Sequence, residues 1–169
     1  MIRKVLLALV PFAFAVGASA QGSGPNVSQL PPPTVMVAPG HTAHVTLKFR
    51  VADYFHINSH KPLDELLLPT EVKLSPPTEI MVSNVIYPDG HMLSLPFAPD
   101  SKLSVYTGDF DVNATVRAAQ NMPVGTFRIH GELKFQACSD RQCFPPKTTP
   151  IAFDVKIAKA KARRTVSHH

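Results

Sequence analysis

The sequence predicts an all-β protein, an immunoglobulin-like antiparallel β-sandwich of about seven to nine strands. Three observations predict this class. Several segments alternate between apolar and polar residues with a period of two, which is the pattern of strands with one buried face. Turn signals rich in glycine and proline separate these segments. The 17 prolines break helix interiors and are tolerated at turns and strand edges, so they count against helices.

Residues 1–20 have the pattern of a signal peptide. Arg3 and Lys4 form a short positive region, residues 5–16 are apolar apart from one proline, and residues 18–20 match the small-x-small cleavage pattern. The apolar run is too short for a spanning helix, which needs roughly 20 residues. We therefore expect cleavage after residue 20, an exported protein, and no transmembrane segment in the mature chain.

The rest of the chain has the length of one domain, which we place at residues 40–157. Residues 21–39 contain three consecutive prolines and are expected to form a flexible leader. Residues 158–169 are expected to form a solvated basic tail. Within residues 21–155, 10 basic and 12 acidic residues nearly balance, so the net charge of +5 comes from the chain ends. This distribution gives no support for nucleic-acid binding by the domain.

The predicted strands follow one another along this domain. The first covers residues 41–51, where odd-numbered apolar residues alternate with polar ones. Residues 91–103 contain two prolines and are expected to be irregular. The longest alternation covers residues 127–138. The other predicted strands are 71–75, 79–87, 104–107, 110–116 and 151–157.

Several functions can be weighed from motifs alone. The sequence contains no GxSxG elbow and no glycine-rich phosphate loop after a strand, so hydrolase and nucleotide chemistry have no support. The eight histidines are scattered along the chain. Together with the two cysteine thiols they could bind a metal such as copper, but no second CxxC or HxxxH motif supplies the ligands that such a site needs. The histidines considered as ligands of such a metal site are His56, His60, His91 and His130.

Cys138 and Cys143 are the two cysteines of the chain and are separated by four residues. The alternation of the preceding strand places Cys138 on its polar side with Gln136, where a partner could reach it. A disulfide here closes a very small loop, which stabilises a fold by only about 2 kcal/mol in the chain-entropy relation.

This small contribution argues against a purely structural disulfide, but spacing alone does not decide among a staple, a redox-active pair and a metal site. Arg141 inside the loop favours a reactive thiolate, whereas Asp140 opposes it. Pro145 and Pro146 stiffen the exit from the second cysteine.

The cysteine segment, residues 135–146, resembles the active-site segment of the N-terminal periplasmic domain of DsbD, the bacterial thiol:disulfide interchange protein. Residues 54–62 resemble the aromatic segment after the first long strand of that family. Residues 87–88 and 103–108 resemble the region around its cap loop. The resemblance covers roughly residues 40–157, which is most of the mature chain.

The resemblance implies that Cys138 and Cys143 form a redox pair in an immunoglobulin-like domain. Cys143 is then the residue that forms a mixed disulfide with a partner, and Cys138 resolves it. An aromatic cap shields the cysteines in this family, and Phe97 is the candidate here. Tyr54, Phe55 and His56 are expected to line the same site, although a packing role is equally open for each. Neither a cofactor nor a metal is implied.

The resemblance also implies partners. The expected electron donor is a thioredoxin-like or membrane disulfide reductase, and the expected acceptors are periplasmic proteins that contain disulfides. Such a relay is a thiol:disulfide oxidoreductase in type. Unlike DsbD, the sequence does not continue into a membrane electron carrier and a thioredoxin-like domain, and its inter-cysteine loop is shorter than in the best-known members. The alternative is a non-enzymatic β-sandwich binding or assembly module with a structural disulfide.

Overall fold

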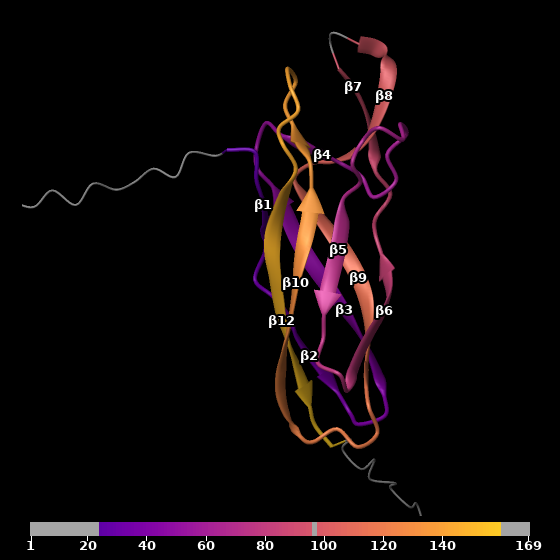
Figure 1. The fold of residues 1–169 in the computed structure, drawn as a ribbon, viewed down its shortest axis with the longest axis vertical. Helices are drawn as coiled ribbons and strands as arrows, with labels where there is room; N and C mark the ends of the chain where they lie inside the picture. Colours follow the sequence, from indigo (N-terminus) through magenta and orange to yellow (C-terminus); the bar gives the residue numbers. More distant parts are fainter. Residues whose placement is uncertain (1–23, 96–97, 160–169) are drawn as a thin grey trace, which may run out of the picture.

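The computed structural model of the protein describes residues 24–95 and 98–159 (Figure 1). These residues form twelve β-strands and no helix, arranged in three four-stranded sheets. The all-β sandwich class is therefore confirmed. The strand number is larger than the expected seven to nine, because several strands are short additions to sheet edges. Nothing in this part of the chain forms a helix long and apolar enough to cross a membrane.

The first sheet is antiparallel throughout and carries one half of the core. The ladder between its two longest strands pairs nine residues of each, and it places the alternating apolar side chains on one face. In sheet order, its strands are β1 (Val27–Gln29), β3 (Thr42–Val51), β9 (Asp109–Ala118) and β6 (Ile80–Ile86).

The second sheet lies against the first and completes the sandwich (Figure 1). Its first strand pairs in parallel with the C-terminal strand, whereas the other two pairings are antiparallel. In sheet order, its strands are β2 (Thr34–Val37), β12 (Lys147–Ile157), β10 (Gly125–Phe135) and β5 (Glu71–Ser75).

The third sheet is smaller and lies at one end of the sandwich, where a hairpin projects beyond the other two sheets (Figure 1). One of its strands, β4, pairs with the cysteine segment on one side and with the hairpin on the other. In sheet order, its strands are β11 (Ala137–Cys138), β4 (His56–Asn58), β8 (Ala98–Tyr106) and β7 (His91–Leu95).

Aromatic and branched aliphatic side chains fill the space between the two large sheets. Phe49 stacks on Phe110 at 5.3 Å between ring centroids, and Phe110 stacks on Tyr106 at 4.8 Å. Complete burial of one such side chain contributes about 1.5–3 kcal/mol. Neither cysteine belongs to this cluster. Its largest fully buried members include Phe49, Phe135, Phe153, Leu47, Ile57, Ile129, Leu133, Ile151 and Ile157.

The expectation of a flexible leader over residues 21–39 is wrong for the part that the structure describes. Val27 in β1 is completely buried, and Val35 and Val37 in β2 are almost so. Each of these short strands pairs with a long strand that is distant in sequence, β3 or β12. Local sequence patterns do not reveal such pairings, because they depend on contacts with other segments of the chain. The proline run between the two strands therefore dominated the prediction.

The expectation of irregular structure over residues 91–103 is also wrong. This segment belongs to the hairpin of β7 and β8. The side chains of residues 91–94 and 100–103 do not alternate between buried and exposed positions, and Met92 is exposed. Hairpin pairing stabilises these strands without a continuous buried face, which removes the signal that identifies a strand from sequence.

Candidate functional site

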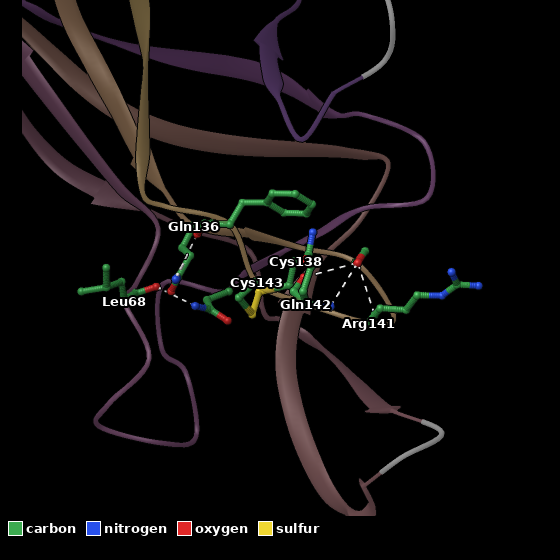
Figure 2. Close-up of a disulfide and its surroundings, with 9 residues drawn as sticks. Leu68, Gln136, Cys138, Arg141, Gln142 and Cys143 are labelled. Atoms are coloured by element: carbon green, nitrogen blue, oxygen red, sulfur yellow. Dashed lines mark hydrogen bonds between the residues drawn. A yellow bond between two sulfur atoms is a disulfide. The ribbon is translucent and has the colours of Figure 1, made fainter.

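Cys138 and Cys143 are joined by a disulfide at the end of the sandwich that carries the third sheet (Figure 2). Their Cα atoms lie 3.9 Å apart, and the two residues form an isolated antiparallel bridge. The pairing that the family resemblance implied is therefore present. The connection between β10 and β12 is the segment that positions it.

The turn between the cysteines is held by its own hydrogen bonds (Figure 2). The backbone N–H groups of Arg141 and Gln142 both donate to the Ser139 hydroxyl at 3.2 Å. The Ser139 N–H donates in turn to the Gln142 carbonyl at 2.8 Å. A serine at the start of a turn does this in many proteins, and the sequence analysis overlooked that signal. The turn is thus defined locally and does not depend on the disulfide alone.

Arg141 does not act on the sulfur atoms. Its side chain is 89% exposed and extends away from them (Figure 2). Its nearest anionic partner is Asp140 at 4.0 Å, also at the surface. Solvent screens charges in such positions, so this pair offers little stabilisation of a thiolate.

The two cysteines differ sharply in exposure, and the expectation for Cys138 is wrong. Cys138 is only 2% exposed, whereas Cys143 is exposed. The alternation was extended through residue 138, but β10 ends at Phe135 and Gln136 lies outside both strands. The chain then starts β11, which pairs with β4 and buries both of its residues. This break in register moves Cys138 from the polar side to the interior.

Two phenylalanines hold the segment after the disulfide in place. Phe144 packs edge-on against Phe55 with ring centroids 5.7 Å apart. The Phe144 N–H donates to the Ala137 carbonyl at 2.9 Å, and the Phe144 carbonyl accepts from the Gln136 side-chain amide at 3.2 Å. Phe55 therefore supports the site by packing. Sequence analysis missed the role of Phe144, because nothing in a local pattern identifies a distant aromatic partner.

His56 lies directly beside the buried cysteine. It is paired with Cys138 in the ladder between β4 and β11, and it is 5% exposed. Its Nε2 atom has no hydrogen-bond partner among the described residues. Burial lowers the pKa of His56 below the ordinary value, and the nearby His91 lowers it further. The imidazole is therefore neutral at pH 7.

Tyr54 occupies the surface next to this position. Its side chain is 95% exposed, and its backbone has a φ of 68°, which non-glycine residues rarely adopt. It lines a hollow of about 500 Å³ together with Phe55, His56 and Asp140. The structure thus gathers three of the four expected lining residues around the cysteine turn. The fourth, Phe97, lies outside the described residues.

The histidines considered as metal ligands are not assembled into a centre. His60 stacks on Tyr87 at 3.8 Å between ring centroids, and its Nδ1 atom lies 3.0 Å from the Thr70 carbonyl oxygen. His130 is exposed on β10. In residues 24–95 and 98–159, no three His, Cys, Asp or Glu side chains form a group that could hold one metal ion.

Fold and site together define a class, a β-sandwich domain with one surface cysteine bonded to one buried cysteine in a turn. The sequence model of the family described as "Thiol:disulfide interchange protein DsbD, N-terminal" matches residues 26–155. The chain therefore belongs to the family of DsbD N-terminal domains, which are thiol–disulfide interchange domains with the immunoglobulin-like fold.

Solved structures of low sequence identity are similar to the chain. The reduced DsbD N-terminal domain of Neisseria meningitidis is 18% identical, with 64% of this chain and 74% of that chain covered and a TM-score of 0.39. In a complex of the DsbD and PilB N-terminal domains from the same organism, the matching chain is 17% identical, with 64% of this chain and 73% of that chain covered and a TM-score of 0.40. The N-terminal periplasmic domain of ScsB from Proteus mirabilis is 12% identical, with 78% of this chain and 44% of that chain covered and a TM-score of 0.47. A comparison with curated proteins found no match. The family assignment depends on the sequence match.

Proposed function

We propose that the chain is a periplasmic thiol–disulfide relay domain in which Cys138 and Cys143 cycle between disulfide and dithiol. It receives electrons from a thioredoxin-like or membrane disulfide reductase and passes them to exported proteins that contain disulfides. The observation that carries this proposal is the unequal exposure of the two bonded cysteines in a member of this family. The signal-peptide pattern of residues 1–20 supports export, and the family supports the periplasm.

The exposure of the cysteines assigns a different role to each. In the reduced domain, the Cys143 thiolate attacks one sulfur of the partner disulfide, and the other partner sulfur leaves with the bonding electron pair and takes a proton. Cys138 then attacks Cys143 from the interior, and the second partner sulfur leaves in the same way. The domain loses two electrons and the partner gains two. Reduction of the domain by its donor is the reverse sequence.

Trapping a mixed disulfide tests these roles. In the Cys138→Ala variant the mixed disulfide on Cys143 cannot be resolved from the interior. A covalent adduct should therefore accumulate with a single-cysteine thioredoxin-like protein whose sulfur carries a nitrothiobenzoate leaving group. The matched control is Cys143→Ala, which retains only the buried thiol and should give no adduct. Non-reducing electrophoresis and mass spectrometry measure both. No adduct with either variant would contradict the relay.

A reversible redox titration of the unmodified chain in glutathione buffers is the second measurement. Structural disulfides of secreted proteins have potentials below about −300 mV and resist the glutathione pool. A relay disulfide should instead reach equilibrium at a potential within the range of glutathione buffers. Tyr54, Phe55 and His56 are proposed to surround the contact with the partner, and Phe97 is proposed as the cap over it.

The burial of Cys138 also suits a second function, a non-enzymatic binding or assembly module with an inert disulfide. Replacing both cysteines by serine separates the two functions. A binding module keeps its partner affinity in this variant, whereas a relay loses all exchange activity. Isothermal titration calorimetry with a captured partner and an exchange assay with the same preparation provide both results.

A further inference from the structure

We propose that His56 is the proton acceptor of Cys138, taking the thiol proton on Nε2 as the disulfide forms and returning it as the disulfide opens. The proposal rests on the relay function and deepens it. It assigns to one buried side chain the proton transfer that the resolving step requires.

The strongest observation is the unpartnered Nε2 atom. Buried polar atoms in folded proteins nearly always have a hydrogen-bond partner, and an exception calls for an explanation. In the disulfide form, neither sulfur carries a proton that His56 could accept. When the disulfide opens, Cys138 becomes a buried thiol with an S–H group, and Nε2 gains the donor that it lacks. The missing partner thus belongs to the other half of the redox cycle.

The position of His56 fits this role. Cys138 and His56 are directly opposed in the antiparallel ladder of β11 and β4. Directly opposed residues have Cβ atoms about 4.5–5.5 Å apart and point to the same face of the sheet. Both side chains are buried, so the Cys138 thiol cannot pass its proton directly to bulk water.

The charge state of His56 also suits a proton acceptor. Burial and the neighbouring His91 lower its pKa, so the imidazole is neutral at pH 7. In the tautomer with the proton on Nδ1, the Nε2 lone pair is available. The other titratable groups around the adjoining hollow are Asp53 on the preceding loop, Tyr54 beside it and Asp140 in the cysteine turn. Burial and His91 both disfavour the charged ring, so the imidazolium is a short-lived state that passes its proton on.

The resolving step then balances. Cys138 Sγ transfers its proton to His56 Nε2 and attacks Cys143 Sγ. The new bond between the two cysteines forms as the bond from Cys143 to the partner breaks, and the electron pair leaves on the partner sulfur. In the reverse direction, His56 first takes up a proton from solvent in the adjoining hollow. The donor thiolate then attacks Cys143, the electron pair moves to Cys138 Sγ, and the imidazolium protonates this buried thiolate. Without that proton, an isolated buried thiolate is strongly disfavoured.

Stopped-flow reaction of the reduced full chain with 5,5′-dithiobis(2-nitrobenzoate) tests the proposal at 412 nm. The first phase reports attack by Cys143 and releases one nitrothiolate. The second phase reports resolution by Cys138 and releases another. In His56→Gln, we expect the second phase to slow by about 10²-fold, the low end for a lost acid–base group, and the first phase to be unchanged. The matched control is His60→Gln, which alters a histidine packed on Tyr87 and should leave both phases unchanged.

The pH profile separates proton transfer from mere packing. The unmodified second phase should be fast at pH 7 and fall only in acid, below the ordinary histidine pKa of about 6.5. In His56→Gln the rate of the second phase should instead rise with pH through the alkaline range in which an ordinary thiol ionises, about 8.5. His56→Asn is the second variant should His56→Gln not fold, with far-UV circular dichroism as the check.

A second phase in the folded variants that matches the unmodified chain in both rate and pH profile overturns the role of His56 and leaves the relay standing. Failure of the relay itself would give another result: the unmodified, fully reduced chain would release nitrothiolate without forming the Cys138–Cys143 disulfide.

Discussion

Opening the Cys138–Cys143 disulfide should weaken the fold only slightly. The perturbation is reduction of the unmodified chain with dithiothreitol, which changes two sulfur atoms and no other group. A relay domain must remain folded in both redox states, whereas a domain stapled by its disulfide needs the oxidised state. The loss of free energy of unfolding on reduction therefore bears directly on function.

The magnitude follows from the size of the closed loop. The cysteines are five positions apart, so the unfolded chain loses little freedom when they are joined. The chain-entropy relation gives about 2 kcal/mol for a loop of this length. The hydrogen bonds of Ser139 and the packing of Phe144 on Phe55 do not involve the sulfur atoms, so we expect them to remain after reduction. No large additional loss is therefore expected.

Equilibrium urea unfolding, followed by far-UV circular dichroism with and without reductant, measures this difference. The slope of the free energy against urea should be similar in both states, because the same core is exposed on unfolding. The Cys138→Ser/Cys143→Ser double variant is a control whose free energy of unfolding does not respond to reductant. A loss above about 4 kcal/mol on reduction, or a reduced chain that is already unfolded without urea, would refute the reasoning and favour a structural disulfide.

Three further predictions follow from single residues. Because the pKa of His56 is lowered by burial, the unfolded chain binds a proton that the folded chain lacks, so the free energy of unfolding should fall as the pH drops through about 6.5. In His56→Gln, the free energy of unfolding measured in urea at several pH values should decrease less as the pH drops. Gly131→Ala should lower the free energy of unfolding by about 1–3 kcal/mol, because the added Cβ meets the Lys73 carbonyl oxygen of β5. The control Gly125→Ala, whose Cβ meets only a side chain at 3.4 Å, should cost less. Tyr54→Gly should raise the free energy of unfolding by about 1 kcal/mol, since glycine adopts the φ of 68° found at this position without strain. A loss of partner exchange in this more stable variant would place Tyr54 at the contact surface, and a decrease in stability would contradict the strain argument.

Long alternating segments were predictable because burial of one sheet face imposes a period of two on the sequence itself. The strands β3, β9 and β12 lie close to the predicted positions, and β5 has the predicted bounds. The cysteine pair could be proposed as a site because two cysteines in one short loop have few uses. The sequence alone thus determined the fold class and the family, and it predicted the candidate site.

The tertiary structure decided what depends on contacts between distant segments. The break at Gln136 and the pairing of β11 with β4 bury Cys138, and local alternation had placed it at the surface. The short strands β1 and β2 exist because long strands offer them an edge. The same pairing of β11 with β4 sets His56 opposite Cys138, with an Nε2 atom that has no hydrogen-bond partner in residues 24–95 and 98–159. Strand register across 82 positions of chain is a property of the packed sheets, because each pairing is stable only when both faces meet their partners, and no local pattern encodes it.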